Sequence, residues 1–374
     1  MGKVGVGVLN TAESSKENLI DRMKGLLSGF YRTCYRIRIR KLIDRAYKDH
    51  RIDEKWKDLL SFAGKDKPSE HTYLVINGFL DAGIERVKRG IHSDDKDDIT
   101  VICVEKNSMT YLPAFLSYYR RIGIKQFLFI DNGSTDDTFE YLKGEEDVTL
   151  YSSRNPFDSY VKVGWILRAV QAEGLDRWYL RADMDEFLTW EGMEDSSVQE
   201  LLSRMKQRGM ASIRVIMTDM YPAGGLMDPL SGEKSFLDEY VYFDNGSSYN
   251  YDARKDRIFG GMRSRTTGAY LRMDKYIFFR PADGQIPVNN HDLTGIGKED
   301  ERICRGVLRH FKFLPSERDR IAYLANEKNS GYSNYKEIKK YGSILDGSVQ
   351  AKTSSSIRYN SSKDLRGLDF IVPL

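Results

Sequence analysis

The sequence is short of the residues that mark several large protein classes. Its 374 residues include three cysteines, Cys34, Cys103 and Cys304, and no C-x-x-C pair. An odd number of widely spaced cysteines predicts neither a zinc site nor a disulfide framework, and it favours a reducing compartment. No apolar run reaches 18 residues, and the opening stretch MGKVGVGVLN lacks the long apolar core of a signal peptide. We therefore expect a cytoplasmic protein.

An excess of one charge and a phosphate-binding glycine loop are also absent. The 58 basic and 55 acidic residues give a net charge of +3, so there is no bulk electrostatic attraction for nucleic acid. The chain has no G-x-x-x-x-G-K-[ST] sequence, and no G-x-G-x-x-G follows the strand predicted at residues 99–104. These absences exclude a P-loop protein and disfavour a dinucleotide oxidoreductase.

Residues 1–95 differ from the rest of the chain because they are dense in Arg and Lys and carry apolar residues at helical spacing. These apolar residues are Leu27, Phe30, Tyr31, Cys34, Tyr35, Leu42, Ile43 and Ala46. We predict a basic helical extension, with one further strand and helix in residues 71–91. One interpretation packs this extension on the main domain with its basic face in solvent. The other lays it on the anionic inner face of the membrane.

A regular alternation of strands and helices begins at residue 98. Buried strands are predicted at 99–104, 125–130, 147–153, 177–183 and 211–217, and helices at 109–123, 136–144, 159–174 and 197–209. This order predicts an α/β fold with a mostly parallel sheet that helices cover on both faces. We expect the main domain to span residues 96–330. A C-terminal helix and a mobile Ser- and Lys-rich tail are expected over 331–374, with LDFIVPL able to dock back.

Polar clusters follow three of these predicted strands. They lie at residues 105–107, 131–132 and 183–185. In such sheets ligands bind outside the carboxyl ends of the strands, so we expect the three clusters to converge on one edge. That edge is the predicted functional site.

The stretch RWYLRADMDEFLTW places Asp183, Asp185 and Glu186 directly after a buried strand. On an extended segment residues i and i+2 point the same way, so Asp183 and Asp185 would form a pair while Glu186 points away in a supporting role. Two carboxylates at a strand end suit Mn²⁺ or Mg²⁺, which bind through one or two carboxylates and the phosphates of a substrate. The pair therefore predicts a metal site for a phosphate-bearing substrate.

Other polar residues have two interpretations each. Asp131 can accept hydrogen bonds from a ribose hydroxyl or a base N–H, or it can close a tight turn. His291 or His310 could complete the metal shell. Arg263 and Arg265, in GGMRSR, could hold a diphosphate or an acidic acceptor, or they could form a solvated basic turn.

The motifs in this order resemble a known family over roughly residues 98 to 325. ICVEKNSMTYLPAFLSYYRRIGIKQFLFIDNGSTDDT, WYLRADMDEFL, MTDMYPAG, GGMRSR and LRHFKF are similar to motifs of the family-2-like glycosyltransferases of bacterial surface-polysaccharide biosynthesis, and of the related family 92. The resemblance implies a GT-A type, Rossmann-like fold and a nucleotide-sugar donor. It implies donor contacts from Asn107, Asp131, Asn132, Asp136, Asp183, Arg263 and Arg265, and metal ligation by Asp183, Asp185 and His291.

These features together predict a metal-dependent, inverting glycosyltransferase that acts on a glycan or lipid-linked acceptor. Inversion requires a carboxylate base near the acceptor hydroxyl. Asp219 is the first choice for this base and Glu186 a second. Asp300, Asp274 and Asp283 are further rivals. Two alternatives remain: a nucleotidyltransferase acting on sugar phosphates, and a non-catalytic carbohydrate-binding relative.

Overall fold

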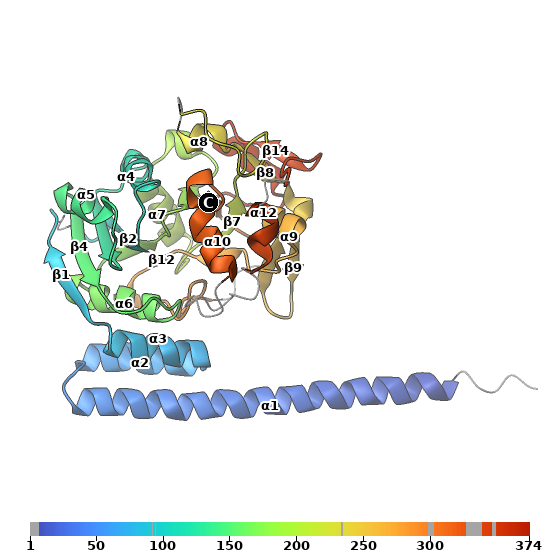
Figure 1. Ribbon diagram of the computed structural model, residues 1–374. Helices are drawn as coiled ribbons and strands as arrows, with labels where there is room; N and C mark the ends of the chain where they lie inside the picture. Colours follow the sequence, from blue (N-terminus) through green and yellow to red (C-terminus); the bar gives the residue numbers. More distant parts are fainter. Residues whose placement is uncertain are drawn as a thin grey trace, which may run out of the picture.

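The computed structural model describes residues 7–91, 93, 95–232, 235–297, 303–326, 339–345 and 349–374, with side chains from Leu27 onward. Its main sheet has six strands in the order β1-β4-β3-β2-β5-β12 (Figure 1). The strands are β1 (Ile84–Lys88), β2 (Ile99–Glu105), β3 (Gln126–Asp131), β4 (Val148–Ser153), β5 (Trp178–Arg181) and β12 (Phe278–Phe279). The four central strands are parallel and the two edge strands are antiparallel to their neighbours. The predicted α/β class with a mostly parallel sheet is therefore confirmed.

Helices cover both faces of this sheet because its central strands are apolar on both sides. Every residue of β2 and β3 is buried, which is typical of parallel sheets. One face packs against α4 (Leu112–Arg121), α5 (Thr138–Gly144) and α7 (Val198–Gln207). The other face packs against α6 (Val161–Glu173), and α3 (Glu70–Leu80), α2 (Glu54–Asp66) and α1 (Gly7–Lys48) extend the same core.

A second sheet of four strands adjoins the first. Its order is β11-β7-β13-β6, with β11 (Asp274–Tyr276), β7 (Arg214–Asp219), β13 (Gly306–His310) and β6 (Glu186–Thr189). Strand β13 runs parallel to β7 and antiparallel to β6. The strand predicted at 211–217 therefore exists, but it belongs to this second sheet and does not extend the first.

The remaining elements are short and surround the second sheet. They are α8 (Phe236–Glu239), β8 (Tyr242–Asp244), β9 (Tyr249–Asp252), β10 (Arg257–Gly260), α9 (Gly261–Thr267), α10 (Arg318–Asn326), α12 (Gly342–Leu345) and β14 (Ser356–Arg358). Within the described residues, short 3₁₀ helices lie at Met193–Asp195, Gly246–Ser248, Pro281–Asp283, Pro315–Glu317, Lys339–Tyr341 and Ser362–Gly367.

The two ends of the chain are more closely tied to the domain than the sequence suggested. Strand β1 precedes residue 96 but pairs with β4 in the main sheet. At the other end, the expectation of a mobile tail is corrected for residues 349–374. There β14 pairs with β8, Leu365 and Leu368 are fully buried, and the N–H of Val372 donates to the carbonyl of Cys304 at 2.9 Å. The tail is held on the domain by its apolar side chains, which include Leu368, Phe370 and Ile371 of LDFIVPL.

The basic extension is helical, and its second half packs on the domain. Tyr35, Ile39, Ile43 and Ala46 of α1 are buried against α2 and α3. Helix α1 is the lowest layer in Figure 1 and continues well past the domain. Within the described residues, no helix is both long enough and apolar enough to span a bilayer.

Candidate functional site

The three acids that interrupt the buried strand lie on a tight turn between the two sheets. The N–H of Glu186 donates to the carbonyl of Asp183 at 2.9 Å, so the chain reverses between β5 and β6. The prediction that Asp183 and Asp185 follow each other on an extended segment is therefore wrong. The turn instead gives the two carboxylates different neighbours.

Asp183 lies between basic groups from a helix of the first sheet and from a strand of the second. Its carboxylate is 2.5 Å from Nζ of Lys162 on α6 and 3.9 Å from Nζ of Lys275 on β11. Burial opposes ionisation, but the two lysines hold the pKa of Asp183 far below its ordinary value. Glu186 also binds Lys275, at 2.5 Å, and accepts the N–H of Asp183 at 2.9 Å. Glu186 thus stabilises the turn, and its predicted role toward a substrate stays a prediction.

Asp185 faces the second sheet. Its Oδ2 is 3.2 Å from Nε2 of His310 and 3.3 Å from Nζ of Lys312. The N–H of Phe311 donates to the carbonyl of Asp185 at 2.8 Å, which fixes the turn against the end of β13. Burial would raise the pKa of Asp185, but Lys312 and His310 hold it well below its ordinary value.

His310 connects Asp185 to a buried ion pair. Strand register places His310 opposite Glu186 on β6 and Asp219 on β7. Its Nδ1 is 2.8 Å from Oδ1 of Asp219, which also forms an ion pair with Arg263. Burial opposes ionisation of Asp219, but Arg263 and His310 lower its pKa to about 2. Burial alone would lower the pKa of His310, and Asp185 and Asp219 together raise it.

Exposure separates an outer from an inner set of groups. The side chains of Asp183, Lys312 and Asp185 are 35%, 20% and 11% exposed. Those of Glu186 and Asp219 are 2% and 0% exposed. An acceptor hydroxyl cannot easily reach a carboxylate that is fully buried and already paired with a basic side chain. This burial and pairing disfavour Asp219 and Glu186 as the catalytic base, whose identity stays a prediction.

The donor atoms around Asp185 are suited to one divalent cation. Two ligands about 2.1 Å from a metal and at right angles lie about 3 Å apart, close to the 3.2 Å between Asp185 Oδ2 and His310 Nε2. Asp219 contacts the other ring nitrogen of His310, and carboxylates commonly hold metal-binding histidines in this way. No three His, Cys, Asp or Glu side chains form a metal cluster within the described ranges. Asp185 and His310 would supply two protein ligands, and the binding of Mn²⁺ or Mg²⁺ stays a prediction.

The ends of the first two parallel strands form a connected loop structure. Asp131, opposite Glu105 in the strand register, accepts the N–H groups of Gly133 at 2.9 Å and Ser134 at 3.2 Å. Asn107 has a positive φ of 53°, and its Oδ1 accepts the N–H of Thr135 at 2.7 Å. These contacts match the tight-turn interpretation of Asp131. They do not test the predicted contact of Asp131 with a nucleotide-sugar donor.

Two further predicted residues stabilise the same loops. The amide of Asn132 donates to the carbonyls of Ser153 and Asn155, at 3.2 and 2.8 Å. Asp136 accepts the N–H of Thr138 at 3.1 Å. The predicted donor contacts of Asn107, Asp131, Asn132 and Asp136 stay predictions.

The remaining predicted residues have partners elsewhere. Arg265 pairs with Asp244 at 2.9 Å, so it is not grouped with Arg263, although both lie on α9. His291 Nδ1 is 2.8 Å from the carbonyl of Asp274, and burial, with the nearby Arg272, lowers its pKa to about 3. Among the contacts of the described residues, His310 and not His291 reaches Asp185. Metal ligation by His291 stays a prediction.

The other candidate bases lie away from the outer groups or outside the described ranges. Asp274 is fully buried between Arg214 and Arg272. Asp283 pairs with Arg280 at 3.2 Å on a single-turn helix. Asp300 lies outside the described residues.

Sequence reasoning missed the basic side of the site. Lys162, Lys275 and Lys312 come from α6, β11 and the segment after β13, and only the fold brings them to the acids. For Lys312 a signal was present, because His310 and Lys312 in LRHFKF alternate as side chains on one face of an extended segment do.

Comparisons with known proteins give only distant likenesses. No protein-family model and no curated protein matches the chain. Among solved structures, S. aureus TarS 1-349 in complex with UDP is 12% identical, with a TM-score of 0.29, over 72% of this chain and 69% of that one. HddC from Yersinia pseudotuberculosis is 9% identical, with a TM-score of 0.27, over 48% and 73%.

A third solved structure matches this chain over nearly the whole of its own length. It is 4-diphosphocytidyl-2C-methyl-D-erythritolsynthase from Anaerococcus prevotii DSM 20548, 11% identical, with a TM-score of 0.26, over 74% of this chain and 99% of that one. Likenesses this distant leave the site to be interpreted from its own geometry.

Proposed function

We propose that the protein is a metal-dependent glycosyltransferase of GT-A type that transfers a sugar from a nucleotide-sugar donor to a glycan or lipid-linked acceptor in surface-polysaccharide synthesis. The observation that carries the proposal is the Asp185–His310 pair, 3.2 Å apart, at the junction of the two sheets. The order of motifs in the sequence supports the same class.

Each group at the site has a role in this proposal. Asp185 and His310 would hold Mn²⁺ or Mg²⁺, and Asp219 fixes the imidazole ring of His310 through Nδ1. Such an ion, when bound, neutralises charge on the diphosphate of the donor. Lys312, the more exposed of the neighbouring cations, offers the same diphosphate a charge-assisted hydrogen bond. Lys162 and Lys275 keep Asp183 ionised at the outer edge of the site, where it accepts hydrogen bonds from donor hydroxyls.

A nucleotidyltransferase is the rival with the most similar requirements. Such an enzyme releases pyrophosphate from a nucleoside triphosphate, whereas a glycosyltransferase releases a nucleoside mono- or diphosphate from a nucleotide sugar. The chain has no Gly-rich basic loop after its first parallel strand, where residues 105–109 read EKNSM. That absence favours the sugar transferase.

The test is slow donor hydrolysis, which needs no known acceptor. The purified protein is incubated with UDP-, GDP-, dTDP- and CMP-sugars and MnCl₂, and the released nucleotide is measured. We expect release from one nucleotide class, and Asp185→Asn should reduce it by at least about 100-fold, because one of two protein ligands is lost. Asp195→Asn, on the exposed turn Met193–Asp195, is the matched control and should retain full release.

The same reaction separates the alternatives. Pyrophosphate release from nucleoside triphosphates and a sugar phosphate, with no hydrolysis of nucleotide sugars, would assign the protein to the nucleotidyltransferases. An Asp185→Asn variant as active as the unchanged protein would refute the proposed metal site.

A further inference from the structure

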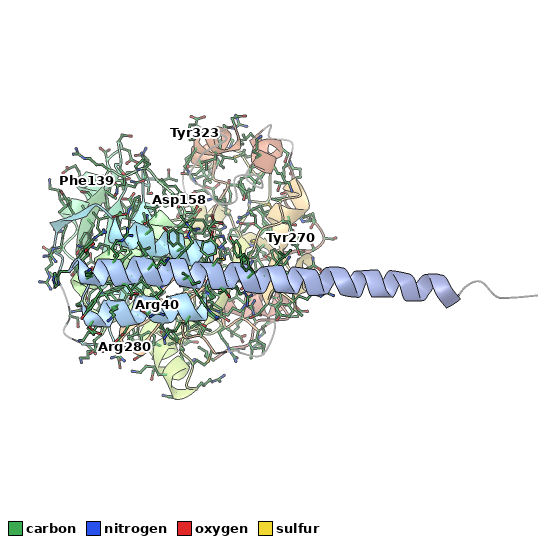
Figure 2. The ribbon with its side chains drawn as sticks, turned by 90° about the horizontal axis from the view of Figure 1, so that it is seen from below. Arg40, Phe139, Asp158, Tyr270, Arg280 and Tyr323 are labelled. Carbon is green, nitrogen blue, oxygen red and sulfur yellow. The ribbon has the colours of Figure 1, made fainter. Side chains whose placement is uncertain are left out.

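The long helix α1 has two faces of different character. Its inner face, with Tyr35, Ile39 and Ile43 at most 7% exposed, packs on α2 and α3. Its outer face is directed away from the domain, and Figure 2 looks onto this side of the helix, where Arg40 is labelled. The inner face explains how α1 is attached, but it does not explain the composition of the outer one.

The outer face of α1 carries large apolar side chains in solvent. Leu27, Phe30 and Ile37 are 65%, 71% and 51% exposed. They are three and seven residues apart, so they lie along one side of the helix. Toward the C-terminal end of the helix, the residues at the same spacing on this side are basic. Together the side consists of Leu27, Phe30, Cys34, Ile37, Lys41, Arg45 and Lys48, and we call it the outer stripe of α1.

The outer stripe lies within a strongly positive segment. Between residues 27 and 48 the chain has seven basic residues and a single acid, Asp44, for a net charge of +6. All seven basic side chains are exposed, and Asp44 is 3.6 Å from Arg40. The chain as a whole carries only +3, so this helix concentrates positive charge that the rest of the molecule offsets.

We propose that the outer stripe of α1 binds the surface of an anionic phospholipid bilayer. Exposed Leu, Phe and Ile insert at the boundary of headgroups and acyl chains, and the surrounding Arg and Lys contact acidic headgroups. A second copy of the helix is a poorer occupant, because pairing two segments of charge +6 brings like charges together. The helix lies on the bilayer, since it is too polar to cross it.

The test is co-sedimentation of the full-length protein with vesicles. Vesicles of phosphatidylcholine mixed with phosphatidylglycerol are compared with vesicles of phosphatidylcholine alone. We expect binding only to the mixed vesicles, and a decline as salt rises, because screening shortens the range of the attraction. Equal binding to both kinds of vesicle, or no binding to either, would overturn the proposal.

Matched variants separate the two parts of the stripe. Lys41→Gln with Arg45→Gln should weaken binding about 25-fold, at about fivefold for each basic residue. Phe30→Ser with Ile37→Ser should also release the protein from mixed vesicles. Control variants at exposed positions of other elements, Arg254→Gln and Tyr323→Ser, should bind as the unchanged protein does. Figure 2 shows Tyr323 far from α1.

Light scattering measures whether the protein is a monomer or a dimer, and so tests whether a second copy covers the outer stripe. We expect a monomer with and without Phe30→Ser and Ile37→Ser. A dimer that these two substitutions dissociate would show that a second copy covers the stripe, and it would refute the membrane assignment. Either result is independent of sugar transfer, because none of these residues belongs to the site around Asp185.

Discussion

Each buried acid of the site has a particular basic side chain beside it. Asp183 has Lys162, Glu186 has Lys275, and Asp219 has Arg263. A buried charge without such a partner would be costly, and the partners of these acids come from distant parts of the sequence. Asp219 and Asp185 both contact His310, but Asp185 is the more exposed of the two and lies 3.2 Å from Nε2, the ring nitrogen that could exchange a proton for a metal ion.

This difference predicts which histidine binds the metal. His310→Ala should weaken Mn²⁺ binding by about 10- to 100-fold or more, whereas His291→Ala should leave it within about threefold, because only His310 reaches Asp185. Binding is measured without donor, by the electron paramagnetic resonance signal of free Mn²⁺. Asp219→Asn should give an intermediate loss, since it weakens one of the contacts that hold the ring, beside that of Arg263, without removing the ligand.

The two histidines serve as controls for each other. If His291→Ala weakened Mn²⁺ binding and His310→Ala did not, the ligand set implied by the family resemblance would hold and the set argued from geometry would fail. Melting curves of both variants establish that neither loses its fold.

Among the elements, the contact between α3 and α6 attaches the helical extension to the main sheet. The helices cross where Gly78 meets Gly164. A Cβ built on Gly164 would lie 2.4 Å from the backbone of Gly78 and Phe79. Only glycine permits this approach, so α1, α2 and α3 depend on it for their position.

We therefore predict that Gly164→Ala destabilises the protein by about 1–3 kcal/mol, because the helices must separate or shift. Urea unfolding followed by circular dichroism measures the change. Gly144→Ala, at the end of α5 with open space around it, is the control and should change stability by less than about 1 kcal/mol. Equal effects of the two substitutions would show that the crossing is not a close contact in solution.

The elements were also the most predictable part of the molecule. Strands β2, β3, β4 and β5 and helices α4, α5, α6 and α7 occur where apolar period and turn residues predicted them. The turn at Asp183–Glu186 was not predicted, because WYLRADMDEFL is apolar enough on both sides of the acids to continue as one extended segment. Its reversal depends on hydrogen bonds to Phe311 and between Asp183 and Glu186, which a local pattern cannot reveal.

In the whole molecule, the site exists because two sheets meet. The first sheet supplies the end of β5, and the second supplies His310 and Asp219 from neighbouring parallel strands. The sequence located the acids and the first sheet, but it could not choose between His291 and His310. That choice depends on the pairing of β13 with both β6 and β7, a contact between segments about 90 to 120 residues apart.

A site built between sheets should couple ligand binding to the stability of the whole fold. Thermal unfolding is measured with MnCl₂ alone, with UDP, GDP or dTDP alone, and with each pair. We expect one nucleotide with Mn²⁺ to stabilise the protein by about 2.7 kcal/mol at 100 times its Kd, and by more than the two separate effects combined. Such synergy is expected because an ion held by Asp185 and His310 would take further oxygen ligands from a diphosphate. In Asp185→Asn the synergy should vanish while the melting temperature without ligand stays high. Equal stabilisation by the nucleotide with and without Mn²⁺ would instead assign diphosphate binding to the lysines alone.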